Sequence, residues 1–188
     1  MSQPDPRVGW AWRSSATGPT RTMTVRAIVK FPDPRLRAVA APVTVFDDRL
    51  RELARDLVDT MRAAPAIGIT APHIGIATRL VALALSPETA PRIYVNPTII
   101  WASTEMIRHP EGSVSMPGVT GEIERAAHVR VRYADLSGAE QVEEASGLRA
   151  ACHQHEVEQL DGIFWIQKLS SLKRDRLVKR YQKLQRLP

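Results

Sequence analysis

One segment restricts the fold of this chain more than any other. Residues 148–160 contain neither glycine nor proline, and Gly162 follows them where a helix C-cap would stand. The segment is therefore predicted to be a helix, and it carries the run His155-Glu156-Val157-Glu158-Gln159. Residues four apart share one face of a helix, so His155 and Gln159 are expected side by side on it.

Two further helices are predicted from apolar spacing. Asp47 and Asp48 are suitable N-caps for an amphipathic helix whose inner residues are Leu50, Leu53, Ala54, Leu57, Val58 and Met61. Ser170 or Ser171 can begin a last helix over about 170–184, with candidate inner residues Leu172, Val178, Tyr181 and Leu184.

The middle of the chain has the pattern of a sheet. Residues 80–85 and 93–95 are short apolar runs, and residues 127–133 alternate between valine and arginine. With the three helices, this predicts an α+β fold. The chain of 188 residues is 44% hydrophobic, which is enough for a single core. We expect one domain over 23–188, preceded by a disordered leader over 1–22. Met23 is an alternative start.

Composition limits the compartment. Cys152 is the single cysteine, which excludes an internal disulfide and a cysteine-rich zinc module, and a buried packing role is expected for it. The sequence has no apolar stretch long enough to span a membrane and no apolar signal core near its start. These features predict a soluble cytoplasmic protein with no membrane partner.

The positive charge is concentrated at one end. The whole chain carries +6, whereas residues 168–188 contain eight Lys and Arg residues against the single Asp175, which leaves −1 for the rest. An acidic partner would therefore bind the last helix. The residues expected to contact it are Lys173, Arg174, Arg176, Lys179 and Arg180.

The central helix has two companions that could complete a site. A histidine followed by a glutamate on a helix suits metal-assisted hydrolysis, in which the glutamate accepts a proton from metal-bound water. Residues 66–75 form a glycine-containing loop before a strand, and residues 111–118 form a second, irregular segment rich in turn formers.

Together the three segments resemble the signatures of peptide deformylases, G-x-G-x-A-A-x-Q, E-G-C-L-S and H-E-x-D-H. The resemblance extends to residues 31–36, 96–97 and 160–162, and it covers about residues 23–184. It implies an α+β fold around the H-E-x-x-H helix and removal of the formyl group from formyl-methionine at nascent-peptide N-termini. It also implies a divalent metal, usually iron, bound by one cysteine and two histidines.

The departures from these signatures fall on the chemistry. Ser113 stands at the cysteine ligand position and Gln159 at the second histidine, so His155 is the one retained ligand position. A neutral hydroxyl and an amide are poor replacements for a thiolate and an imidazole. His73 stands where the resemblance implies an oxyanion-binding glutamine.

The residues expected to shape the cleft are retained. Gly68, Glu111 and Gly112 stand where the family has them, Glu156 keeps the position of the proton-transferring glutamate, and Val114 still offers its backbone N–H to an oxyanion. A cleft for formyl-methionyl N-termini can therefore persist without the reaction.

Three hypotheses follow. The first is a deformylase-like protein with no tightly bound metal and little or no activity. The second is an active hydrolase in which His73 joins His155 in a rebuilt Fe²⁺ or Zn²⁺ site. The third is a module that binds the ribosome or its RNA through the basic last helix. Two other histidines lie outside these hypotheses, since His153 is expected on another helix face and His109 on a surface loop.

Overall fold

The computed structural model describes residues 23–86 and 88–186, so the leader expected over 1–22 lies outside the described residues. The helices are α1 (Asp48–Ala63), α2 (Gly147–Leu160) and α3 (Ser171–Leu184), with short 3-10 turns η1 (Pro34–Arg37), η2 (Ala71–Ile74) and η3 (Trp165–Lys168). The strands are β1 (Gly68–Thr70), β2 (Leu80–Leu83), β3 (Arg92–Ala102), β4 (Met106–Ser113), β5 (Met116–Ala126), β6 (His128–Ala134) and β7 (Glu140–Ser146).

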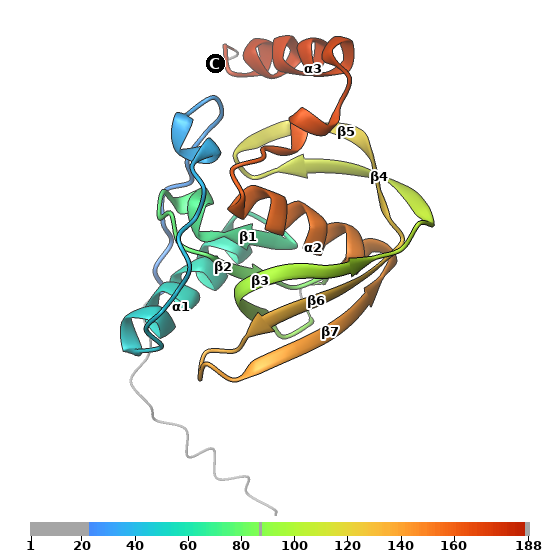
Figure 1. Cartoon of the computed structure of the whole chain (residues 1–188). Coiled ribbons are helices and arrows are strands. Elements are labelled where there is room, and N and C mark those ends of the chain that lie inside the picture. Colours follow the sequence, from blue (N-terminus) through green and yellow to red (C-terminus); the bar gives the residue numbers. More distant parts are fainter. Residues whose placement is uncertain (1–22, 87, 187–188) are drawn as a thin grey trace, which may run out of the picture.

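The strands form two antiparallel sheets with a helix between them. The larger sheet has the order β1-β2-β3-β6-β7, and β4 pairs with β5 as a separate hairpin. Figure 1 shows α2 running between the two, α1 beside the β1–β2 end and α3 beyond the hairpin. This arrangement confirms the α+β class.

Helix α1 follows the predicted pattern. The Asp47 side chain accepts the Leu50 backbone N–H, which satisfies one of the free donors at the helix start. Its buried face packs on β2, where all four residues are buried. Side chains alternate along a strand, so Leu80 and Ala82 contact the α1 side while Val81 and Leu83 face α2.

Helix α2 is fastened to the hairpin as well as to the large sheet. The side-chain amide of Gln154 accepts the Ala126 N–H at 3.0 Å and donates to the Ala126 carbonyl at 2.9 Å. The residue after the C-cap, Gly162, has a φ of 76°, and a side chain there would overlap the Arg37 carbonyl. The glycine predicted to end this helix is therefore required by the positive φ and also by the close approach of the Arg37 carbonyl.

Expectations about α3 and about residues 111–118 are partly wrong. Leu172 and Leu184 are exposed, at 60% and 37%. The buried residues of α3 are Tyr181, which was predicted, and Leu177, which the sequence pattern missed. Residues 111–118 are not an irregular segment, because 111–113 end β4 and 116–118 begin β5, joined by a tight turn. No helix within the described residues is long and apolar enough to cross a bilayer.

Candidate functional site

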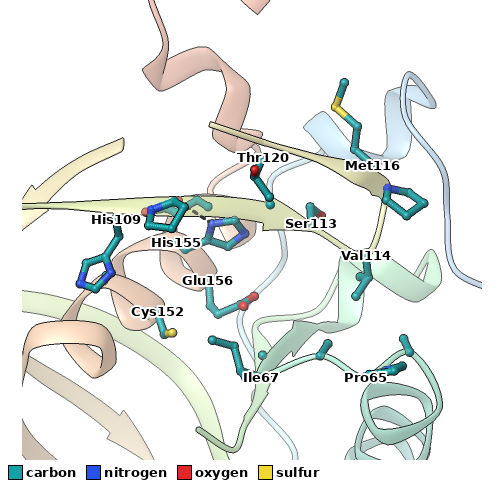
Figure 2. Close-up of a pocket in the computed structure, with 18 of the residues that line it drawn as sticks. Pro65, Ile67, His109, Ser113, Val114, Met116, Thr120, Cys152, His155 and Glu156 are labelled. Carbon is teal, nitrogen blue, oxygen red and sulfur yellow. Dashed lines mark hydrogen bonds and ion pairs between the residues drawn. The ribbon is translucent and has the colours of Figure 1, made fainter. Parts of the chain in front are cut away.

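A cavity of about 430 Å³ lies between α2, the hairpin and the segment around β1. Figure 2 shows side chains from all three regions directed into it. The lining residues that bear on its chemistry are Gly68, His73, Glu111, Gly112, Ser113, Val114, Cys152, His155 and Glu156. Nearly every predicted site residue thus lies on one cavity, and Gln159 is the exception.

His155 is held by a buried ion-pair network. Its Nδ1 lies 2.9 Å from a carboxylate oxygen of Glu111, and Arg125 binds the same carboxylate with two nitrogens at 2.7 and 2.9 Å. Burial alone would lower the pKa of His155, but the hydrogen bond to Glu111 and the charge of Glu156 raise it. Glu111, despite its burial, has its pKa lowered to about 2 by Arg125 and His155.

Glu156 is the second polar side chain on this part of α2. It is 6% exposed, and its Oε2 has no hydrogen-bond partner among the described residues. Burial raises the pKa of this carboxyl to about 7, although His155 opposes the rise. A Cβ on Gly68 would overlap Oε1 of Glu156, so a glycine is needed for the carboxyl to reach the cavity wall.

His73 enters the site with a defined tautomer. Its Nδ1 accepts the Thr70 backbone N–H at 3.0 Å and lies 2.9 Å from the Thr70 hydroxyl. Burial, with the nearby positive charge of His155, lowers the pKa of His73 to about 3, so the ring is neutral. A neutral ring that accepts at Nδ1 carries its proton on Nε2. His73 therefore presents an N–H donor.

Ser113 lies next to this donor. Its Oγ is 3.4 Å from Nε2 of His73 and accepts the Ser115 backbone N–H at 3.1 Å. Because Nε2 carries the proton, His73 donates to Ser113 and cannot accept its proton. The pair therefore does not form the nucleophile and base of a serine hydrolase.

Gln159 is directed away from the cavity. It is buried, and its Nε2 donates to the Leu36 backbone carbonyl at 2.8 Å. The amide thus joins α2 to η1 and is not among the cavity-lining residues.

These contacts do not fit the iron or zinc that the resemblance implies. Both lone pairs of Ser113 accept hydrogen bonds, the free nitrogen of His73 carries a proton, and Gln159 is engaged by Leu36. The described residues contain no group of three His, Cys, Asp or Glu side chains able to bind one ion. A tight transition-metal site needs three or four such ligands, and His155 is a single one. The geometry therefore also disfavours the rebuilt site centred on His73.

The other candidate residues lie either at the cavity or on the opposite face of α2. The Val114 carbonyl accepts the Lys30 ammonium at 2.8 Å. Cys152 is buried as expected, and burial with the charges of Glu156 and Glu111 raises its pKa to about 12. His153 lies on the other face of α2, against the Tyr94 ring. His109 is not on a surface loop, since it lies on β4 and lines the cavity.

Two functional residues were missed by the sequence reasoning. Arg125 is 2% exposed and joins Glu111 to Glu158, and Thr70 sets the tautomer of His73. The alternating apolar pattern before Arg125 in β5 places its side chain on the buried face, which was the available signal. For Thr70, the signal was its place three residues before His73, the spacing of a capping box.

Comparison with known proteins agrees with the fold. Residues 25–175 match the family described as Polypeptide deformylase. A Brucella melitensis protein named peptide deformylase-like is 68% identical over 87% of this chain and 100% of its own length. A Brucella suis peptide deformylase is 44% identical over 86% of this chain and 94% of its own length.

Solved structures agree as well. The Ehrlichia chaffeensis peptide deformylase superposes with a TM-score of 0.82 at 31% identity, covering 87% of this chain and 98% of that one. A Legionella pneumophila peptide deformylase gives 0.80 at 35% identity, covering 88% and 100%. The three signature segments, their meeting at one cavity and these matches over most of the chain lead to one conclusion: the chain belongs to the polypeptide deformylase family.

Proposed function

We propose that this chain binds formyl-methionyl peptide N-termini in the cavity and hydrolyses them slowly or not at all. The supporting observation is the hydrogen-bond network that occupies the expected ligand positions, with Ser113 bonded to Ser115 and His73 and with Gln159 bonded to Leu36. A ligand set of this kind has no tightly bound metal, so no metal-activated water is available to attack the formyl carbon.

The retained parts support binding. Glu111 is locked by Arg125 beside the cavity, Gly68 leaves room for Glu156, and Val114 follows Ser113 at the turn of the hairpin. Glu156 can still exchange a proton at its Oε oxygens. Without an activated water beside it, that exchange has no nucleophile to serve.

Metal analysis combined with an activity assay tests the proposal. We expect anaerobically purified protein to contain far less than one equivalent of iron, zinc or nickel per chain. We also expect it to bind a formyl-methionyl peptide and to release formate slowly or not at all. Metal content near one equivalent, or turnover equal to that of an active deformylase assayed beside it, would contradict the proposal.

A second role is supported by α3. Its Leu177 and Tyr181 pack against the hairpin, whereas Lys173, Arg176, Lys179 and Arg180 are exposed on its other faces and form no ion pair within the described residues. Arg174 is half-buried. We propose that the four exposed basic side chains of α3 bind the phosphates of ribosomal RNA. This binding would bring the cavity near nascent N-termini.

A further inference from the structure

The hydroxyl group of Ser113 can donate one hydrogen bond to a ligand. Its oxygen accepts the Ser115 N–H at 3.1 Å and the Nε2–H of His73 at 3.4 Å, which uses both lone pairs. Its own proton has no acceptor among the described residues. Ser113 lines the cavity, so the O–H is left to donate to whatever the cavity binds.

Glu156 has an acceptor oxygen that lacks a hydrogen-bond donor. Its Oε2 is buried at the same cavity and has no partner within the described part of the chain. A carboxyl group keeps an accepting oxygen in either protonation state, so Glu156 can accept an N–H from a ligand whatever its charge. Leaving both groups unpaired in a desolvated site would cost free energy, which a matching ligand recovers.

A ligand that satisfies both groups must have an oxygen acceptor and an N–H donor. A formamide has this pair, because its carbonyl oxygen accepts and its N–H donates. A free α-ammonium group has donors but no acceptor oxygen, so it would leave the Ser113 hydroxyl unpaired.

We infer that the Ser113 hydroxyl binds the formyl oxygen of a peptide N-terminus and thereby distinguishes a formylated from an unformylated one. The inference rests on the proposed function and adds a role to it. Ser113 is then a specificity-determining residue that donates to the oxygen. His73 positions it by donating to Ser113, and the Thr70 N–H in turn donates to His73.

Calorimetric titration with two peptides tests the inference without any reaction. Chelator-treated wild type, Ser113→Ala and Ser113→Thr are titrated with formyl-Met-Ala-Ser and with Met-Ala-Ser. We expect Ser113→Ala to weaken binding of the formyl peptide about three- to tenfold, the usual effect of one neutral hydrogen bond, and to leave the free-amine peptide unchanged. Ser113→Thr keeps a hydroxyl and should keep the preference.

The controls separate loss of this hydrogen bond from general damage. Ser171→Ala removes an exposed hydroxyl at the start of α3 and should behave as wild type. A thioformyl-Met-Ala-Ser peptide tests the same contact in the unmodified chain. Sulfur is a weaker acceptor than oxygen, so this peptide should bind less tightly than the formyl peptide.

The outcomes distinguish two kinds of failure. Wild type that binds neither peptide would overturn both the proposed function and the role of Ser113. Wild type that prefers the formyl peptide, with the same preference in Ser113→Ala, would overturn the role of Ser113 alone. Equal weakening of both peptides in Ser113→Ala would also overturn it, because Ser113 would then shape the cavity and not bind the formyl oxygen.

Discussion

At the scale of single residues, two positions that the resemblance assigns to metal ligands each hydrogen-bond to a fixed acceptor. Glu111 accepts from Nδ1 of His155, which leaves Nε2 of that ring toward the cavity. The Leu36 carbonyl accepts from Gln159, in the place where the Nδ1–H of a histidine could donate instead. Acceptors of this kind orient the ligands of metal sites.

This arrangement predicts that the ligand set can be rebuilt. The double variant Ser113→Cys with Gln159→His should bind about one equivalent of a transition metal and show some deformylase activity, because three ligands are then present and His155 is already oriented by Glu111. Either single change should bind little metal, since ligands act as a set. Elemental analysis and the visible spectrum of the Co²⁺-loaded protein measure the result.

A control and a contrary outcome belong to this test. Adding Gln159→His to Ser113→Ala supplies two imidazoles but no thiolate, so it should remain metal-poor. If the Ser113→Cys/Gln159→His protein folds and still contains no more metal than wild type, positions 113, 155 and 159 do not form a ligand set.

Gly68 gives a second test at this scale. A Cβ at this position would overlap Oε1 of Glu156 and lie 3.1 Å from its Cδ, so Gly68→Ala should destabilise the protein by about 1–3 kcal/mol through overpacking. Urea unfolding measures the change. In a Glu156→Ala background the same substitution should cost much less, because its main neighbour is gone. Equal costs in the two backgrounds would show that the carboxyl is not the obstacle.

At the scale of elements, the hairpin β4–β5 connects the site to α3. Its one end carries Ser113 and its outer face packs against Leu177 and Tyr181 of α3. A Cβ on Gly118 of β5 would lie 3.1 Å from a Leu184 methyl, which shows how closely the helix approaches the strand. Because the Leu177 and Tyr181 side of α3 packs on the hairpin, only basic side chains on the rest of the helix are exposed to solvent.

The exposed face of α3 predicts salt-sensitive binding to ribosomes or structured RNA. If Lys173, Arg176, Lys179 and Arg180 contact about four phosphates, affinity should fall by about three orders of magnitude over a tenfold rise in salt. Changing these four residues to Gln should flatten the dependence. Filter binding across a salt series measures both slopes.

The matched control removes the same charge from another helix. Arg49, Arg51, Arg55 and Arg62 are exposed on α1, and their change to Gln should leave most of the slope in place. Equal effects of the two variants would assign the binding to net charge and not to α3.

At the scale of the whole molecule, one partly buried cluster of polar side chains joins β3, β7 and α2. Glu143 of β7 accepts the Tyr94 hydroxyl at 3.0 Å, pairs with Arg149 of α2 and lies 3.2 Å from Arg92. Burial alone would raise the pKa of Glu143, but Tyr94, Arg149, His153 and Arg92 together lower it.

This lowered pKa predicts an acid-dependent stability. The folded state holds the Glu143 proton less tightly than the unfolded state, so the stabilisation is present above the unfolded pKa and is lost as pH falls through the folded one. Urea unfolding from neutral pH into the acid range should therefore give a shallower decline for Glu143→Gln than for wild type, from a lower starting stability. Parallel curves would mean that Glu143 does not contribute in this way.

The sequence predicts local elements better than the contacts between them. Helix α1 and the glycine stop after α2 follow from spacing and caps, because those signals act over a few residues. The choice of Leu177 over Leu172 in α3 depends on where the hairpin lies, which no local pattern contains. The substitutions at Ser113 and Gln159 were visible in the sequence, whereas the turning of Gln159 toward Leu36 required the packed structure.

The hydrogen bond between Gln159 and Leu36 also has a genetic consequence. Glutamine and histidine codons differ only at their third base, and serine and cysteine codons can differ by one base. Both residues can donate to the same carbonyl, so an exchange at position 159 leaves α2 fastened to η1 either way. Either ligand alone is expected to leave catalysis unrestored, so selection for catalysis would not act on a single exchange. Such chains can therefore exchange residue 113 or residue 159 singly while the scaffold stays the same. Only a gene that encodes both ligands, cysteine at 113 and histidine at 159, would show a phenotype.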